Sequence, residues 1–163
     1  MMNNLYRLNA AVIVFNQEGN VLVFKRVDCD NQWQFPQGGI DKGETHKEAA
    51  LRELQEETSI RSVKHVAEYP QALRYDFPPH VLEKFQKMGR KNIGQEQYWH
   101  LFFFNGSEEE INFTSHLEEI EFKGYKWIDI MSAPDLVVDF KKDVYRKVCA
   151  HFQPIIQNYI NNI

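Results

Sequence analysis

The sequence has few of the features that mark several large classes of protein. Its two cysteines, Cys29 and Cys149, lie far apart and form neither a disulfide framework nor a zinc-binding CxxC pair. No apolar run approaches the length of about 18 residues that a membrane helix needs, and no cationic segment followed by an apolar one begins the chain. We therefore expect a cytoplasmic protein in a reducing compartment, with no membrane partner.

Positive charge is also scarce. The 163 residues include 19 Lys and Arg against 23 Asp and Glu, so the net charge is −4. There is no overall basic field to hold a long polyanion, so no DNA partner is expected, and a phosphate partner must be held by local cations or by a metal. With 43% hydrophobic and 26% charged residues, the composition is that of a globular protein. The length fits one domain over residues 1–163.

Hydrophobic patterns predict strands alternating with helices. Runs of β-branched and aromatic residues predict strands at 10–15, 21–24, 63–69, 72–77, 95–105 and 125–130. The first two should form a hairpin, because Gly19 lies in the turn between them. Residues 33–39 contain Pro36 and two glycines, and 80–91 is weakly amphipathic; we predict a loop for each, the second with a helical turn.

Two principal helices are predicted. Residues 45–58 contain no Gly or Pro and are rich in helix formers; Thr45 and Glu48 form a capping box. A short helix is expected within 132–138, and a longer one from Lys141 to Pro154. The apolar tail at 154–163 should pack on its own domain, and the chain should be a monomer. The fold class is therefore α/β (α+β), with helices packed on a mixed sheet.

The helix at 45–58 carries three carboxylates on one face. At about 100° per residue, Glu56 lies about 60° to one side of Glu53 and Glu57 about 40° to the other. Leu51, Leu54 and Thr58 form a separate stripe that can pack on a sheet. In a partly buried cleft, two such charges about 6 Å apart repel by roughly 2.8 kcal/mol.

This repulsion predicts a cation at the glutamates. Arg52 relieves part of it, and a hard divalent ion that prefers oxygen ligands, Mg²⁺ or Mn²⁺, would relieve the rest. Zinc has little support there, because neither cysteine is in the segment and His46 lies two turns away. Acidic residues on a helix most often form only a solvated face. The diglycine loop, Glu44 and Arg52 favour a site instead.

The spacing of these residues resembles the Nudix box, the motif of hydrolases that act on nucleoside diphosphates linked to another group. The matching pattern is Gly38-x5-Glu44-x7-Arg52-Glu53-Leu54-x-Glu56-Glu57-x-Ser59-Ile60. Ser59 replaces the usual Gly at the helix end, where a positive φ is convenient. The resemblance implies an α/β/α sandwich with a mixed β-sheet between helices. Segments 6–7, 33–39, 73–78, 94–99, 121–127 and 140–146 extend it to bacterial RNA 5′-pyrophosphohydrolases and the similar asymmetric diadenosine tetraphosphate hydrolases.

The resemblance implies roles for residues inside the box. Glu53, Glu56, Glu57 and the carbonyl of Gly38 or Gly39 would bind Mg²⁺ or Mn²⁺. Glu53 is the candidate general base, with Glu56 and Glu57 as rivals. Arg52 would orient the glutamates, and Glu44 would pair with Arg52.

It also implies roles outside the box. Glu121 would be a fourth carboxylate ligand, unless it is simply a surface acid. Arg7 and Arg26 would hold terminal phosphates, unless they are ordinary surface cations. Tyr75 and Phe140 would stack on a base, unless they are core aromatics. Gln95 and Lys141 would contact phosphate or base.

Three functions remain open from the sequence. The chain removes pyrophosphate from 5′-triphosphorylated RNA, or it splits dinucleoside tetra- or pentaphosphates, or it binds nucleotides without turnover as a regulator. The RNA substrate is favoured, and Lys84, Lys87, Arg90 and Lys91 could line a groove for it. The regulator is disfavoured, because the three box glutamates and Arg52 are all present.

Overall fold

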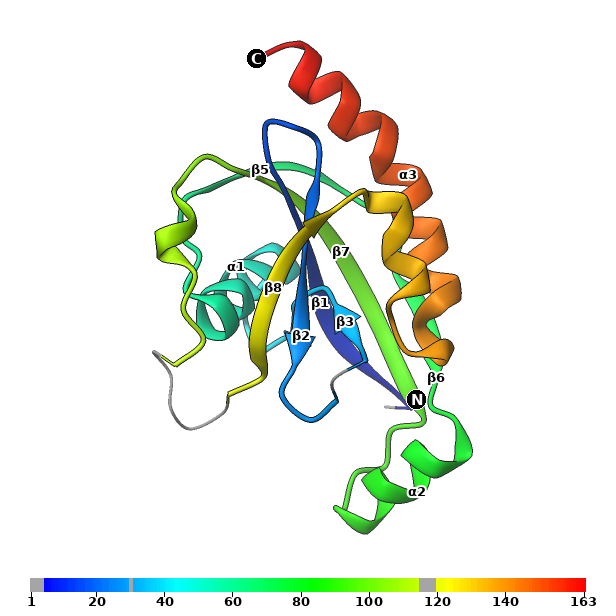
Figure 1. Cartoon of the computed structure of the whole chain (residues 1–163). Coiled ribbons are helices and arrows are strands. Elements are labelled where there is room, and N and C mark those ends of the chain that lie inside the picture. The colour runs from blue at the N-terminus through cyan, green and yellow to red at the C-terminus, as the bar shows by residue number, and fades with distance from the viewer. Residues whose placement is uncertain (1–4, 30, 115–119) are drawn as a thin grey trace.

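Two long strands form the centre of a mixed sheet in the computed structural model, which describes residues 5–29, 31–114 and 120–163. Strand β1 (Tyr6–Phe15) pairs in parallel with β7 (Gly94–Phe104) along its whole length. The other pairings are antiparallel: β2 (Val21–Arg26) and β4 (Gln37–Gly39) on β1, β3 (Trp33–Gln34) and β8 (Phe122–Ile128) on β2, and β5 (Val63–Glu68) and β6 (Leu73–Asp76) on β7. The described residues thus form an eight-stranded mixed sheet. Figure 1 shows β1 and β7 side by side at its centre.

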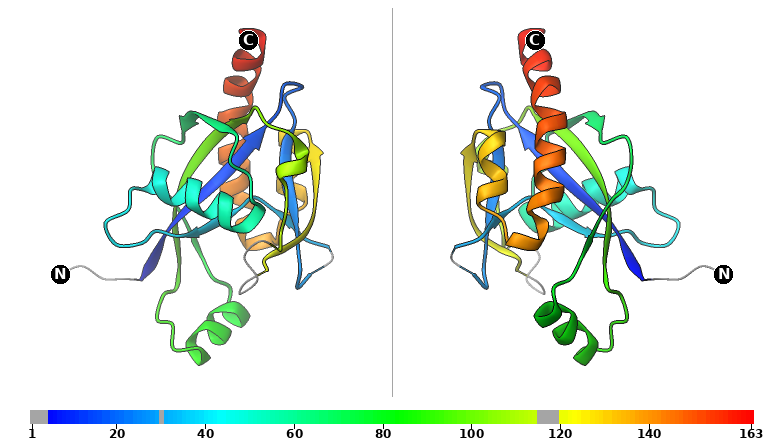
Figure 2. Two further views of the ribbon diagram at one scale, coloured as in Figure 1. Left: turned by 90° about the vertical axis from the view of Figure 1, so that its left-hand side faces the viewer. Right: turned by 90° about the vertical axis from the view of Figure 1, so that its right-hand side faces the viewer.

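Helices cover both faces of this sheet. Alternate residues of β1 point to opposite faces, so Ile13 joins one core cluster and Val12 the other. The first cluster lies under α3 (Lys142–Asn161), which contributes Phe152, and the second under α1 (His46–Thr58), which contributes Leu54. The two helices lie on opposite sides of the strands in Figure 2. The predicted α/β/α sandwich with a mixed sheet is confirmed.

Helix α1 begins and ends as its sequence predicts. The Thr45 side chain accepts a hydrogen bond from the Glu48 amide, the Glu48 side chain accepts one from the Thr45 amide, and the capping box is complete. The helix ends at Ser59, which adopts the left-handed conformation with φ of 66°. A serine therefore holds the positive φ expected at this position, and its hydroxyl donates to the Asn112 carbonyl at 2.8 Å.

The loop predicted for residues 33–39 is wrong. It contains β3 and β4, which are separated by Phe35 and Pro36 and pair with β2 and β1. Pro36 lies between the strands, where its missing N–H removes no ladder hydrogen bond. The two glycines are in β4, where close neighbours leave no room for side chains. These pairings join distant segments, so local sequence does not reveal them.

The loop predicted for residues 80–91 is mostly a helix. Helix α2 (Pro79–Lys87) starts with proline at its first turn, a favourable position because the first helical N–H groups lack partners in any case. None of its residues is buried, and Phe85 packs on Phe77 with ring centroids 4.8 Å apart. Figure 1 shows α2 projecting from the end of the sheet.

The helix predicted to stop at Pro154 continues to Asn161 as α3. Proline removes one hydrogen bond to the carbonyl of Ala150, but both residues are exposed, so water can satisfy that carbonyl. Ile156 beyond the proline is 2% exposed and belongs to the α3 core cluster, which offsets the loss. The predicted packing of the tail on its own sheet is confirmed.

Smaller differences concern the ends of elements and their type. Strand β8 starts three residues earlier than expected, at Phe122, because Phe122 is buried against Phe24. The short helix expected within 132–138 is a 3-10 helix at Ile130–Asp135, and another 3-10 helix at Asp139–Lys141 leads into α3. None of the helices in the described residues has the length and apolar character that crossing a bilayer requires.

Candidate active site

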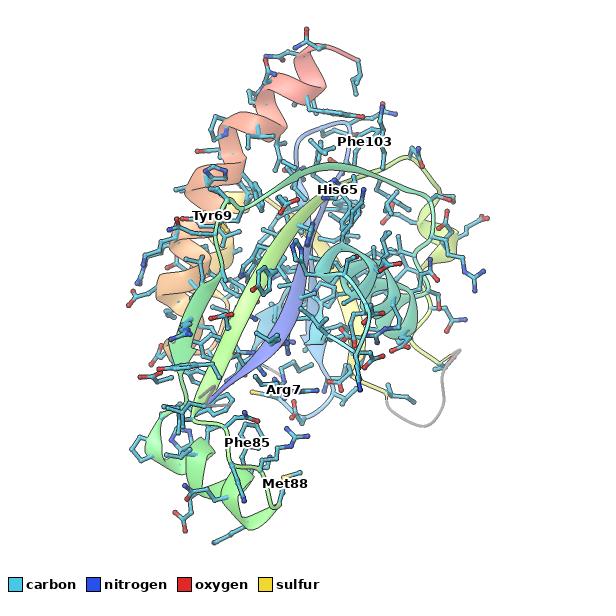
Figure 3. The ribbon with its side chains drawn as sticks, turned by 180° about the vertical axis from the view of Figure 1, so that it is seen from behind. Arg7, His65, Tyr69, Phe85, Met88 and Phe103 are labelled. Atoms are coloured by element: carbon cyan, nitrogen blue, oxygen red, sulfur yellow. The ribbon has the colours of Figure 1, made fainter. Side chains whose placement is uncertain are left out.

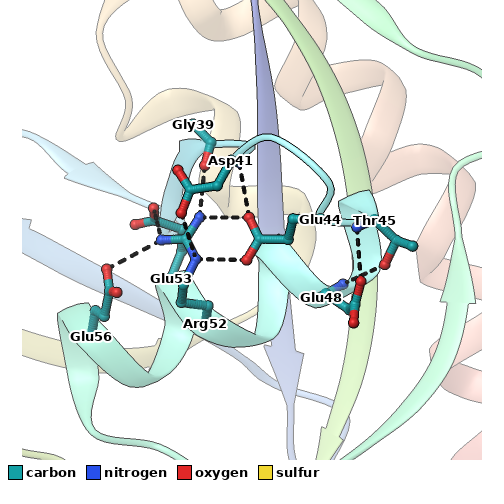
Figure 4. Close-up of polar contacts among 8 residues, drawn as sticks. All are labelled: Gly39, Asp41, Glu44, Thr45, Glu48, Arg52, Glu53 and Glu56. Carbon is teal, nitrogen blue, oxygen red and sulfur yellow. Dashed lines mark hydrogen bonds and ion pairs between the residues drawn. The ribbon is translucent and has the colours of Figure 1, made fainter.

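Arg52 is the centre of a polar network on α1 (Figure 4). Its Nε and Nη2 donate to the two carboxylate oxygens of Glu44 at 2.7 and 2.9 Å, and Nη2 also donates to the Gly39 carbonyl at 2.8 Å. Its Nη1 donates to Glu53 at 2.8 Å and to Glu56 at 3.3 Å. The Arg52 guanidinium lowers the pKa of Glu44 to about 2. Arg52 thus ties the glutamates to the diglycine segment.

The two glycines of β4 leave space for charged side chains. A Cβ at position 38 would overlap the Glu53 carboxylate, and one at position 39 would overlap the Arg7 guanidinium. Strand β4 pairs with β1 through Ala10 opposite Gly38 and Asn9 opposite Gly39. The sheet therefore brings the backbone of β4 directly against the carboxylate of Glu53.

Burial raises the pKa of two box glutamates. For Glu53 the main cause is desolvation, which the Arg52 guanidinium partly opposes. For Glu57, which is half-buried, desolvation and the neighbouring carboxylates of Glu53 and Glu121 all raise the pKa well above its usual range. Without a cation these groups are costly to ionise together, as their sequence spacing predicts.

These glutamates line a cavity of about 620 Å³. The predicted site residues that line it are Arg7, Arg26, Gly38, Glu53, Glu57, Tyr75, Gln95, Glu121, Phe140 and Lys141. They come from β1, β2, β4, α1, β6, β7, the residue before β8 and the 3-10 helix before α3. The fold thus gathers into one cavity residues that are more than 130 positions apart in sequence, as Arg7 and Lys141 are.

Three predicted residues do not line the cavity. Arg52 reaches lining residues by donating to Glu53 and to the Gly39 carbonyl, and Glu44 accepts from Arg52, so both contact the cavity indirectly. Glu56 is exposed and its carboxylate faces Arg52. Its predicted part as a metal ligand or base therefore has less support from this geometry than those of Glu53 and Glu57.

A cation group lines the same cavity and consists of Arg7, Arg26, Lys84, Arg90 and Lys141. Arg26 donates to both carboxylate oxygens of Asp28, at 2.8 and 2.6 Å, and to Gln34 at 3.2 Å. Lys141 is 7% exposed, and desolvation together with the Arg26 charge lowers its pKa to about 8. The cavity therefore contains both carboxylates that suit a metal and cations that suit phosphate oxygens.

Aromatic rings occupy another part of the cavity. Tyr75 and Phe140 are in contact, with ring centroids 5.5 Å apart and planes at 49°, and Tyr75 donates a hydrogen bond to Gln95 at 2.9 Å. A base held between two rings needs about 7 Å, or two stacking distances. In this conformation the rings are too close to hold a base between them, and a sandwich requires Phe140 to move away from Tyr75.

Sequence reasoning missed some lining residues. Phe85 and His80 of α2 line the cavity, but the segment was expected to be mainly loop. Lys84 and Arg90 line it as suggested, whereas Lys87 pairs with Glu83 at 3.3 Å along the helix. Asp28 could have been found, because it follows Arg26 by two residues at the end of a strand.

The residues present fit a divalent metal. Glu57 Oε2 is a buried oxygen with no hydrogen-bond partner among the described residues. Such an atom is costly unless something binds it. Glu53 and Glu121 line the same cavity, and the Gly38 backbone lies against the Glu53 carboxylate. Oxygen donors of this kind suit Mg²⁺ or Mn²⁺ better than softer ions.

Comparisons of the whole chain with known proteins agree on one protein family. A profile described as "NUDIX domain" matches residues 5–148. The chain is 41% identical over 155 residues to an RNA pyrophosphohydrolase of Erythrobacter litoralis, covering 93% of both proteins. It is 40% identical over 154 residues to Nudix hydrolase 26, chloroplastic, of Arabidopsis thaliana, covering 93% of this chain and 71% of that protein.

Solved structures share the fold at lower sequence identity. The E. coli dihydroneopterin triphosphate pyrophosphohydrolase superposes with a TM-score of 0.70 at 22% identity, covering 91% of this chain and 97% of that one. A C. elegans Ap4A hydrolase superposes with a TM-score of 0.59 at 18% identity, covering 88% and 97%. At these identities the likeness concerns the arrangement of strands and helices.

Proposed function

Since the chain belongs to the Nudix hydrolase family and is a hydrolase of pyrophosphate links, we propose that its substrate is the 5′-triphosphate end of RNA, from which it removes pyrophosphate. The observation that carries this proposal is that Glu53, Glu57 and Glu121 line the same cavity as the cation group. Relatives at about 40% identity over most of their length, from several bacteria, are named RNA pyrophosphohydrolase. Residues 1–163 would act as one domain, because α3 packs on the same sheet beyond the matched region.

Glu53, Glu57, Glu121 and the Gly38 carbonyl would hold Mg²⁺ or Mn²⁺. When bound, such an ion neutralises phosphate oxygens and lowers the pKa of a coordinated water. The cation group would hold the remaining phosphate charge, with Lys141 protonated below its pKa of about 8. Repulsion between the oxygens and the nucleophile is the main obstacle to hydrolysis, so both groups act on the same barrier.

Glu53 is our candidate for the general base. It lines the cavity, its pKa is raised by desolvation, and Arg52 fixes its carboxylate through Oε1. Glu57 is the remaining rival, because it also lines the cavity and has a raised pKa. Glu56 is the weaker rival, since its carboxylate is exposed and bound to Arg52.

Dinucleoside polyphosphates are the second candidate substrate. The observation that favours them is the aromatic group of Phe77, Phe85 and Phe140, which lines the cavity near the cations and could stack a second base. Helix α2 favours RNA instead, since its exposed surface projects beyond the cavity with Lys84 and Lys87 on it. The cytoplasmic location remains a prediction that depends on the two free cysteines.

A direct comparison of substrates tests the proposal. Pyrophosphate release from a 5′-triphosphorylated RNA oligonucleotide and cleavage of diadenosine tetraphosphate should be measured with Mg²⁺, with Mn²⁺ and with chelator. We expect metal-dependent hydrolysis and a higher kcat/KM on RNA. A higher kcat/KM on the dinucleotide would favour the second candidate. No metal-dependent turnover of either substrate would overturn both and leave a nucleotide-binding regulator.

A further inference from the structure

Three histidines from distant segments meet on the α1 face of the sheet. His46 starts α1, His65 lies on β5 and His100 lies on β7. His100 is fully buried; its Nε2 lies 2.7 Å from His46 Nδ1, and its Nδ1 lies 2.9 Å from His65 Nε2. Both nitrogens of the buried ring therefore face other imidazoles.

An irregularity in β5 adds a carboxylate to this group. His65 pairs with Phe102 and Glu68 pairs with His100, with a shift in register between His65 and Ala67. In a regular strand, residues three apart point to opposite faces. The extra residue, Val66, puts His65 and Glu68 on the same face as His100, as β-bulges commonly do near functional sites.

We propose that His65, Glu68 and His100 form a binding site for a divalent transition metal of the zinc type, separate from the carboxylate site. One ligand atom from each lies within 4.8 Å of the other two. Two imidazoles and a carboxylate are a common ligand set for zinc, with a water in the fourth position. For tetrahedral coordination the His65 and His100 nitrogens, 2.9 Å apart, would separate to about 3.3 Å, and the Glu68 oxygen, within 4.8 Å of both, would take a similar distance from each.

The protonation states suit metal binding. Desolvation and the neighbouring His46 and His65 lower the pKa of His100 to about 3, and desolvation lowers that of His65. These rings are therefore neutral at physiological pH, with lone pairs available. Lys47 also lowers both pKa values, but it is exposed, so solvent and salt screen its repulsion of a bound cation.

His46 would orient His100 without binding the metal. If His100 Nδ1 faces the metal, its Nε2–H donates to His46 Nδ1, which fixes the tautomers of both rings. His46 Nε2 then carries a proton and lies 4.0 Å from Glu68 Oε2. The His46 ring is itself stacked on Tyr98, with centroids 4.5 Å apart and planes at 10°. The metal would thus link strands β5 and β7 to the start of α1.

This site is independent of the catalytic cavity. None of its four residues lines the cavity, and Figure 3 shows His65 and Arg7 toward opposite ends of the sheet. The ligands also differ in kind, because imidazole favours Zn²⁺, Co²⁺ or Ni²⁺ whereas the glutamates favour Mg²⁺. Excess Mg²⁺ can therefore occupy the carboxylate site while the histidine site is examined.

Titration with Co²⁺ in excess Mg²⁺ tests the proposal, because four-coordinate Co²⁺ absorbs visible light far more strongly than six-coordinate Co²⁺. We expect one equivalent of strongly absorbing Co²⁺, displaced by Zn²⁺, and a higher Tm with Zn²⁺. His65→Gln and Glu68→Gln should each weaken this binding by more than about 10-fold, since even indirect partners of metal ligands contribute that much. His151→Gln, outside the cluster, should bind as the native chain does.

Two results would overturn the proposal. One is the absence of a strongly absorbing Co²⁺ species in the folded native protein with Mg²⁺ present. The other is equal binding by the native chain, His65→Gln and Glu68→Gln, which would place the ion elsewhere. The circular dichroism of each variant confirms its fold, and both substituted residues lie on β5 at the end of the strand order, where a surface change is tolerated best.

Discussion

The candidate active site combines two groups of residues that are assembled in different ways. The Arg52 network, comprising Gly39, Glu44, Arg52, Glu53 and Glu56, lies within 18 consecutive residues and is held by five hydrogen bonds of 2.7 to 3.3 Å from one guanidinium. The cation group comes from β1, β2, α2, the segment after it and the 3-10 helix before α3. The first is assembled by local sequence, the second only by the complete fold.

This difference suggests that the two groups affect different kinetic constants. The Arg52 network fixes carboxylates whose positions decide the chemical step, so damage there should lower kcat. The cation group holds charge that substrate and transition state share, so damage there should mainly raise KM. Measuring kcat and KM for variants of each group tests whether this division of effects is real.

The largest effect is expected for Glu53→Gln. Loss of the proposed base should lower kcat by about 10³-fold, within the range for general bases, and leave the fold intact because Gln has the same shape. Steady-state kinetics on 5′-triphosphorylated RNA measures this, with Glu18→Gln as the matched control. The control should keep native activity, since Glu18 is exposed in the turn between β1 and β2 and does not line the cavity. Near-normal turnover by Glu53→Gln would remove Glu53 from the base role and favour Glu57.

A smaller loss is expected for Arg52→Lys. Lysine keeps the charge but cannot bind Glu44, Glu53 and the Gly39 carbonyl together, so Glu53 should lose its fixed orientation. We expect kcat to fall by about 10- to 100-fold. We also expect the Mg²⁺ concentration that gives half-maximal activity to rise. Titrations of activity with Mg²⁺ on native protein and variant supply both values. An unchanged Mg²⁺ requirement with a raised KM for RNA would contradict the division between the two groups.

The cation group should show its effect in the pH profile. Lys141 has a pKa of about 8, so it is charged and able to bind phosphate below that pH and neutral above it. The pH dependence of kcat/KM reports the ionisation of groups in the free enzyme. The value of kcat/KM should therefore fall to about one tenth as the pH rises through about 8. Lys141→Arg, which stays charged, should remove this decline. If the variant keeps the same alkaline limb, another group causes it.

The same contrast explains which features the sequence predicts. Helix α1, its capping box and the glutamate face depend on residues a few positions apart, and all were predicted from spacing. Strands β3 and β4 depend on pairing with β2 and β1, and so were predicted as a loop. The continuation of α3 past Pro154 depends on burial of Ile156 against the sheet, which no local pattern reveals.

Site residues follow the same rule. Arg7, Arg26, Tyr75, Gln95, Phe140 and Lys141 were named only through the family resemblance, because nothing in their own neighbourhoods distinguishes them. The cluster of His46, His65 and His100 was not predicted at all. Its members are separated by 19 and 35 positions, and only the parallel placement of β7 on β1, with β5 beside it, brings them together.

The smallest effect is expected at the end of α1, where local sequence departs from the family pattern. Ser59 occupies the left-handed region at φ 66°, which costs a residue with a side chain about 1–2 kcal/mol relative to Gly. Its hydroxyl recovers about 0.5–1.5 kcal/mol by donating to the Asn112 carbonyl at 2.8 Å. These contributions nearly cancel, so Ser59→Gly should change the free energy of unfolding by less than about 1 kcal/mol.

Thermal unfolding of Ser59→Gly and Ser59→Ala separates the two contributions. Ser59→Gly removes backbone strain and hydrogen bond together and should shift Tm by no more than about 3 °C. Ser59→Ala keeps the strain but loses the bond, so it should be the less stable variant. Both should keep native kcat, because Ser59 does not line the cavity. Equal stability of the two variants would mean that the positive φ at position 59 costs nothing, and a Ser59→Ala variant as stable as the native protein would mean that the hydroxyl contributes nothing.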